Sequence, residues 1–88
     1  MIPRQRSHLN VQTVGDESLV LDLSCDQIHQ LNATATWIFQ HCDGHTSVED
    51  LSDELAEIYS IERDRAKTDL RQTIEQLAAL NLIEFTGE

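Results

Sequence analysis

The sequence predicts an α+β fold. A three-stranded antiparallel meander is followed by three helices, and a short strand can follow them at the C-terminal end. Apolar residues alternate in short runs in the first third of the chain and recur at helical spacing afterwards. A single asparagine separates the two patterns. The length of 88 residues is that of one domain with a small core.

The predicted strands lie near residues 9–14, 18–23 and 28–31. The turn Gly15-Asp16-Glu17 separates the first two strands, and the polar residues 24–27 separate the second from the third. Loops this short join neighbouring strands antiparallel, so the three strands form a meander. Its apolar face needs a cover of helices.

Residues 1–7 contain Pro3 and a polar run that offers little to bury. We therefore expect a flexible N-terminal segment over residues 1–7 and a single domain over residues 8–88. No internal repeat or low-complexity tract divides this domain further.

Asn32 is the predicted N-cap of the first helix, because its side-chain oxygen can accept hydrogen bonds from free N–H groups of the first turn. This helix runs to Cys42 and stops at Asp43-Gly44. A hydroxyl cap at Thr46-Ser47 begins the second helix, which is acidic on its outer side and ends near residues 59–60.

The third predicted helix covers about residues 63–80 and turns one apolar stripe toward the core. Asn81 is its expected C-cap, and residues 82–85 return to an extended pattern. The stripe consists of Ala66, Leu70, Thr73, Ile74 and Leu77.

The chain carries 16 acidic and 6 basic side chains, which gives a formal net charge of −10. A surface of that sign repels phosphate backbones, so nucleic acid is a poor partner. We expect an acidic body with one basic strip on the third helix. The strip consists of Arg63, Arg65, Lys67 and Arg71.

Cys25 and Cys42 are the two cysteines, and two thiols without a secretory context usually stay reduced. No window of the sequence is long and apolar enough to cross a membrane, so we expect a cytoplasmic protein. His41, Cys42 and His45 lie close in sequence without a paired metal-ligand spacing, and no catalytic motif stands out. The sequence therefore predicts no metal site, no cofactor and no enzyme.

Three segments carry a family resemblance. They are L-N-A-T-A running on to C-D-G (Leu31 to Gly44), T-S-V-E-D-L-S-D-E-L (Thr46 to Leu55) and the distal D-L…I…L…L-N-L-I (Asp69 to Ile83). In this order and spacing they resemble the PqqD-like family, over about Leu19 to Glu84.

The resemblance implies a small winged-helix-like domain without chemistry of its own, a peptide chaperone that recognises ribosomally synthesised, post-translationally modified peptides. Such a protein binds the leader of a precursor peptide and presents it to a modifying enzyme. In the namesake pathway, pyrroloquinoline quinone biosynthesis, the partner is a radical S-adenosylmethionine enzyme. In that family the leader adds as a strand beside the third strand and lies against the last helix.

Two departures from the family pattern leave the pathway open. The turn Ser24-Cys25-Asp26-Gln27 lacks the Pro-x-Gly character that is common in quinone-pathway members. Asn81-Leu82-Ile83 stands where those members often have a Gly-Trp pair. A lasso-peptide or another modified-peptide pathway is an equal alternative, and we expect a monomer or a homodimer.

The predicted peptide-binding residues lie on the third strand and the third helix. An edge strand has free backbone N–H and C=O groups that can pair with an added strand. On the helix, apolar side chains would meet apolar leader residues, and basic side chains would meet acidic ones. The predicted set is Ile28, His29, Gln30, Leu31, Arg63, Lys67, Leu70, Arg71 and Ile74.

Each of these assignments has a structural alternative. The basic residues of the predicted set, Arg63, Lys67 and Arg71, can form i,i+4 ion pairs with neighbouring acids. Leu70 and Ile74 can simply pack in the core. A second copy or the N-terminal tail can cover the edge strand, and Trp37 can belong to the core or to a protein contact. The alternative functions are a general docking module and a winged-helix DNA-binding module, which the acids among the basic strip disfavour.

Overall fold

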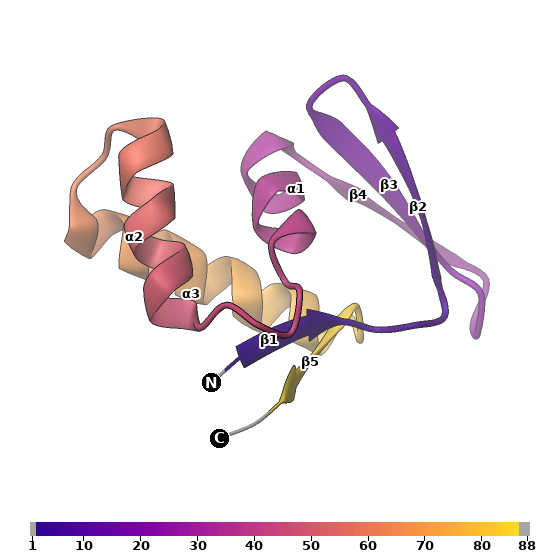
Figure 1. The fold of residues 1–88 in the computed structure, drawn as a ribbon. Coiled ribbons are helices and arrows are strands. Elements are labelled where there is room, and N and C mark those ends of the chain that lie inside the picture. Colours follow the sequence, from indigo (N-terminus) through magenta and orange to yellow (C-terminus); the bar gives the residue numbers. More distant parts are fainter. Residues whose placement is uncertain (1, 87–88) are drawn as a thin grey trace.

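A computed structural model describes residues 2–86 and contains two small antiparallel sheets and three helices in that range (Figure 1). Helix α1 lies between the three-stranded sheet and the packed pair α2 and α3 (Figure 1). The elements in chain order are β1 (Ile2–Gln5), β2 (Leu9–Val14), β3 (Glu17–Asp22), β4 (Gln27–Leu31), α1 (Ala33–Gln40), α2 (Val48–Tyr59), α3 (Arg63–Ala79) and β5 (Ile83–Thr86).

Strands β2, β3 and β4 form the antiparallel meander that the sequence predicts, each within one residue of its expected bounds. Gly15 makes the turn from β2 to β3 with a φ of 66°, a conformation that glycine adopts without steric cost. In the β3–β4 loop, the Asp22 carboxylate accepts hydrogen bonds from the N–H of Ser24 at 3.0 Å and from its hydroxyl at 2.6 Å. Residues within or next to each turn therefore close both turns.

The predicted flexible segment over residues 1–7 is wrong for residues 2–5, which form β1 and pair antiparallel with β5. The partner strand lies about 80 positions away, so no local pattern in the sequence could reveal the pairing. Met1 lies outside the described residues, and the rest of the expected single domain is described as far as Thr86.

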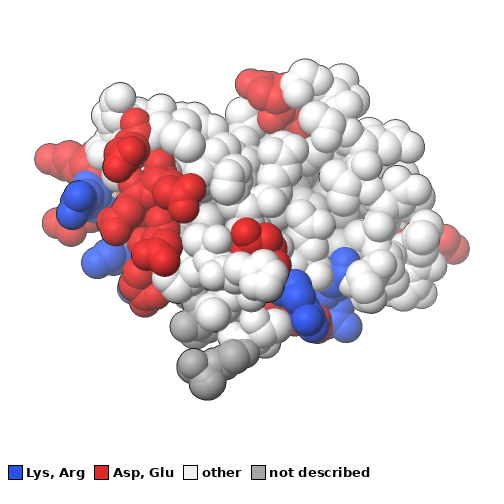
Figure 2. All heavy atoms as spheres, in the orientation of Figure 1, with Lys and Arg blue, Asp and Glu red and all other residues white. Residues whose placement is uncertain are grey.

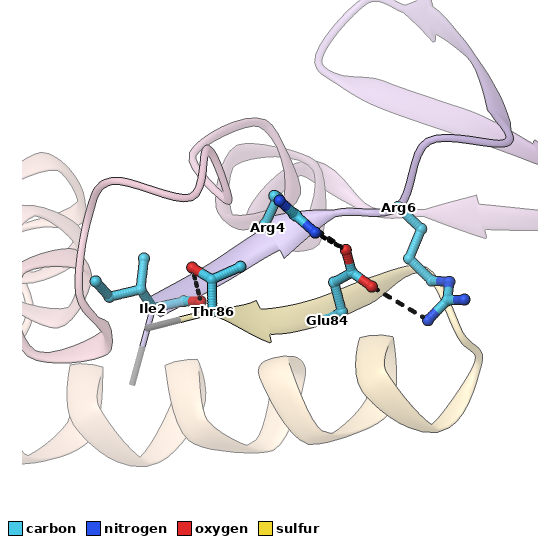
Figure 3. A network of polar contacts seen from close by, with 5 residues as sticks. All are labelled: Ile2, Arg4, Arg6, Glu84 and Thr86. Atoms are coloured by element: carbon cyan, nitrogen blue, oxygen red, sulfur yellow. Dashed lines mark hydrogen bonds and ion pairs between the residues drawn. The ribbon is translucent and has the colours of Figure 1, made fainter. Parts of the chain in front are cut away.

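Contacts on both sides hold β1 in place. Pro3 is fully buried, and the N–H of Gln5 donates to the carbonyl of Cys42 at 3.0 Å. Across the two-stranded ladder, the side chain of Arg4 donates to the carboxylate of Glu84 (Figure 3). The N-terminal residues are thus an integral strand of the fold.

Asn32 caps α1 as predicted, because its Oδ1 accepts a hydrogen bond from the N–H of Ala35 at 2.8 Å. The helix ends at Gln40, two residues before the expected Cys42. The hydroxyls of Ser18 on β3 and Thr36 on α1 are buried and lie 2.8 Å apart, and this hydrogen bond ties the helix to the sheet.

The core lies between the inner face of the meander and the three helices. Alternate residues of β3 point into it, and α2 and α3 each contribute one buried stripe, as their spacing predicts. The apolar members with the least exposure are Val20, Leu31, Ile38, Phe39, Cys42, Leu51, Leu55, Ala66, Leu70, Ile74, Leu77, Leu82 and Ile83.

Acidic side chains gather on the outer side of α2, at the helical end of the molecule (Figure 2). The helix begins after Ser47, whose hydroxyl oxygen accepts from the N–H of Asp50 at 3.2 Å. Helix α3 ends at Ala79 and its C-cap is Leu80, one residue before the predicted cap Asn81. Asn81 follows in the left-handed conformation with a φ of 61°. Within residues 2–86, each helix is too short or too polar to span a bilayer.

Candidate functional site

Strand β4 is an edge of the meander. Within residues 2–86 it pairs with β3 on one side, and its other side carries backbone N–H and C=O groups with no strand beside them. Its five residues present about 17 Å of edge at about 3.4 Å per residue. An extended segment of another chain can pair with such an edge.

The side chains of β4 alternate between the two faces of the sheet. Ile28 and Gln30 point to the outer face, where Ile28 is 67% exposed. His29 and Leu31 point toward the helices, and Leu31 is part of the core. A strand added at this edge would therefore place its own alternate side chains beside an exposed isoleucine and beside the core boundary.

The imidazole of His29 is half-buried, and its Nε2 is shielded from solvent without a hydrogen-bond partner among the described residues. Buried polar atoms are normally paired, so an unpaired ring nitrogen next to an open edge is unusual. The sequence placed His29 in the predicted set for its backbone, and the structure adds this property of its side chain.

On α3, the predicted apolar and basic residues have different surroundings. Leu70 is completely buried and Ile74 nearly so, which agrees with the alternative of core packing and leaves Leu70 no surface for a ligand. Arg63, Lys67 and Arg71 are exposed, and within residues 2–86 none of them forms an ion pair.

The predicted i,i+4 pairing therefore does not hold for those three cations within the described part of the chain. It holds for the fourth residue of the strip, because Arg65 lies 3.7 Å from the carboxylate of Asp69. The exposed cations are thus available to a ligand, at the cost only of leaving water.

The strand and helix parts of the predicted site do not line one groove. A groove of about 420 Å³ runs along α3, and its walls include Arg71 and Ile74 together with Val48 of α2 and Phe85 of β5. No residue of β4 lines it, and apart from its partner strand β3, β4 lies mainly against α1. Of the predicted residues of α3, Arg71 and Ile74 line this groove, whereas the other three do not. The predicted set is therefore divided between the open edge of β4 and the surface of α3.

Sequence reasoning missed Phe85 and Val48 as neighbours of Arg71. Phe85 is 42% exposed and belongs to the short C-terminal strand, whose position depends on the unforeseen β1. Val48 is the first residue of α2 and is partly buried against the core. An exposed aromatic residue in an extended segment was the available signal.

The N-terminal tail does not cover β4, because residues 2–5 pair with β5 instead. This observation removes one of the two alternatives for the edge strand within the described residues. The other alternative, a second copy of the chain, concerns a contact that a single chain does not contain.

The two cysteines differ in environment. Cys42 is buried in the core, and burial raises the pKa of its thiol to about 12, with a further contribution from the charge of Asp43. Cys25 is exposed in the β3–β4 loop. Among residues 2–86, no three His, Cys, Asp or Glu side chains gather so that they could hold a metal ion.

Comparison with known proteins identifies the family of the chain. The model of the family described as coenzyme PQQ synthesis protein D (PqqD) matches residues 17–83. The chain belongs to the PqqD family. The match begins at the first residue of β3 and includes β4 and the three helices, so every predicted peptide-binding residue lies within it.

Two solved structures share the fold of this PqqD-family chain. One is TbiB1 in complex with the TbiA(beta) leader peptide, with 22% identity, a TM-score of 0.84, and coverage of 97% of this chain and 99% of that one. The other is a lasso peptide synthetase B1 complexed with the leader peptide, with 25% identity, a TM-score of 0.83, and coverage of 96% and 99%. Among curated proteins, none matches the chain significantly.

Proposed function

We propose that this protein is a non-catalytic adaptor that binds the leader of a ribosomally made precursor peptide and presents it to a modifying enzyme. The observation that carries the proposal is the open edge of β4. Two further facts support it: the chain belongs to the PqqD family, and the two similar structures are complexes with leader peptides.

The leader binds as an added strand on β4. Backbone hydrogen bonds supply affinity, each worth about 1 kcal/mol net. Selectivity comes from alternate side chains of the leader, one set beside Ile28 and Gln30 on the outer face and the other beside His29 and Leu31 on the inner face. The pairing needs no movement of the meander, since the edge is already open.

The basic residues of α3 attract acidic residues of the leader. Arg63, Lys67 and Arg71 are exposed cations on a molecule whose net charge of −10 otherwise repels acidic segments, so an acidic part of the leader is favoured beside these three side chains. Ile74 contributes to the apolar wall of the groove beside Arg71. Leu70 acts beneath this surface, where it fixes the position of the helix in the core.

The partner enzyme follows from the pathway. In pyrroloquinoline quinone biosynthesis it is a radical S-adenosylmethionine enzyme, and a lasso-peptide or other modified-peptide system is the alternative. The two departures from the quinone-pathway pattern, in residues 24–27 and 81–83, keep both open. We place the protein in the cytoplasm, where precursor peptides are synthesised.

Solution NMR of the isotope-labelled protein tests the binding mode. The ligands are synthetic leader segments of the short precursor-like reading frames that neighbour its gene. We expect the amides of residues 27–31 to shift and to become protected from hydrogen exchange. The amides of β2, the opposite edge of the same sheet, are the internal control and should not become protected.

Each other outcome is informative. Protection of β2 instead of β4 would overturn the binding mode while leaving a peptide-binding protein. Shifts confined to α2 would remove the whole candidate site. Failure of every leader segment to bind would overturn the adaptor function itself.

A further inference from the structure

A second hollow lies on the opposite side of the meander from β4. It has a volume of about 240 Å³ and opens between the β2–β3 turn, one flank of α1 and the last residue of α2. The side chains that matter here are Asp16 from the turn, Trp37 and Gln40 from α1, and Tyr59 from α2. None of the residues proposed to bind the leader lines this hollow.

Two aromatic residues and one aspartate are among the residues that line it. Tyr59 is 40% exposed, and Trp37 is half-buried against the core. The ring of His41 stacks on the Trp37 indole at 4.1 Å between centroids, and its Nδ1 donates a hydrogen bond to the Trp37 carbonyl oxygen at 2.7 Å. The indole is thus presented at a fixed angle, which limits the ordering cost of binding.

Aromatic faces carry negative electrostatic potential and attract cations, with Trp the strongest of the three rings. Asp16 adds a carboxylate to the lining, and among residues 2–86 no lysine or arginine lines the hollow. The net charge of −10 favours the approach of a basic partner from solution. The carboxylate of Asp16 and the rings of Trp37 and Tyr59 therefore all favour a cationic ligand.

We propose that this hollow is a second binding site, which takes an arginine or lysine side chain from a basic segment of a partner protein. The aliphatic part of such a side chain packs on the rings of Trp37 and Tyr59, and its cationic end reaches Asp16. Trp, Tyr and Arg are also the residues that dominate binding energy at protein interfaces. The site does not depend on the proposed leader binding.

The positions of the two sites add a consequence. β4 is one edge of the three-stranded sheet and β2, which carries the Thr13 wall of the hollow, is the other. A strand added at β4 leaves this hollow open. One molecule can therefore hold an extended peptide at one edge and a basic partner segment at the other.

Fluorescence gives a direct test, because Trp37 is the single tryptophan of the chain. The probe is a short arginine peptide with both ends capped, titrated into the full-length protein. We expect a saturable change in Trp37 emission. Asp16→Asn should weaken the apparent affinity several-fold, and Tyr59→Leu should weaken it while leaving the far-ultraviolet circular dichroism unchanged.

Asp53→Asn is the matched control, since it removes the same charge from the exposed side of α2, outside the hollow. An equal loss in Asp53→Asn and Asp16→Asn would overturn the proposal, because general charge attraction would then explain the binding. Unchanged Trp37 emission would overturn it as well, and so would an equal response to a capped glutamine peptide. A lysine peptide that binds like the arginine peptide supports it.

Discussion

Glu84 of β5 lies opposite Arg4 of β1, and its Oε2 accepts a hydrogen bond from the Arg4 Nε at 3.0 Å (Figure 3). A second arginine approaches the same carboxylate, with the Nη1 of Arg6 3.5 Å from Oε1. The hydrogen bond from Arg4 is the main reason why the pKa of Glu84 lies below its ordinary value of 4.5, and the charges of the two arginines add to it. The contact joins elements from the two ends of the chain.

Glu84→Gln should reduce the loss of stability in acid. The folded protein binds the Glu84 proton more weakly than the unfolded chain, because its pKa is lowered in the fold. Its stabilising contribution is therefore complete above about pH 4.5 and is lost as the pH falls through the lowered value. Thermal unfolding followed from pH 7 downward should show a shallower decline for the variant than for the wild type.

Glu57→Gln is the control for that experiment, since its exposed carboxylate on α2 has no ion pair within residues 2–86. It should keep the wild-type slope. Some slope should remain in Glu84→Gln, because hydrogen bonds from Ser24 to Asp22 and from His45 to Asp43 also lower the pKa of those carboxyls. Parallel curves for Glu84→Gln and the wild type would contradict the prediction.

Asn32→Ala should lower the free energy of unfolding by about 1 kcal/mol, because it removes the capping hydrogen bond to the N–H of Ala35. Asn32→Asp keeps an acceptor at the same place and should recover most of the loss. Chemical denaturation of the three proteins measures both effects. Equal stability of the alanine and aspartate variants would show that the cap contributes little.

The two thiols should differ in reactivity. Burial raises the pKa of Cys42 to about 12, so at neutral pH it is protonated as well as inaccessible, whereas Cys25 is exposed. Mass spectrometry after brief alkylation of the native protein should find Cys25 modified and Cys42 intact. Cys42 should react once the protein is denatured, and rapid native modification of Cys42 would mean that the core opens easily.

Arg71→Glu should weaken leader binding several-fold at low salt, and adding Lys67→Glu should weaken it further. Both side chains are exposed and without an ion pair among the described residues, so they are available to acidic groups of a ligand. Arg65→Glu reverses the same charge at a residue already paired with Asp69, and it is the matched control. Calorimetric titration separates the two, and an equal loss in both would point to net charge alone.

Substitution of Ile28 should affect leader binding, whereas substitution of Leu31 should affect stability, although both residues lie on β4. Ile28→Ser removes an exposed side chain and should change stability by less than about 0.5 kcal/mol while it weakens leader binding. Leu31→Ala removes a core side chain and should cost about 2–5 kcal/mol of stability. Loss of stability in Ile28→Ser would show that its outer face is covered.

The sequence was sufficient for those parts of the fold that depend on local pattern. These parts are the three meander strands, the Asn32 cap and the buried stripes of α2 and α3. Each of them follows from residues that are close together in the sequence. The β1–β5 sheet could not be predicted in this way, because its register depends on contacts across the whole chain. Pro3 and the polar residues after it look like a tail until a partner strand is present.

For the candidate site, too, the parts that depend on local sequence were predictable and the parts that depend on distant contacts were not. An open edge at β4 follows from the order of three short strands, which local turns determine. Which residues surround Arg71 depends on how α2, α3 and β5 meet, and the spacing on one helix does not contain that information. The hollow at Trp37 could not be predicted from the sequence either, because its walls come from three separate elements.

The pairing of Ile2 with Thr86 brings the described ends of the chain to one place, away from β4 and from the β2–β3 turn (Figure 1). A host protein could therefore accept this domain as an insertion in one of its loops, with the entry and exit points a single strand spacing apart. Covalently joining the two ends would need only a short linker, and new openings could then be made in the β2–β3 turn or the β3–β4 loop.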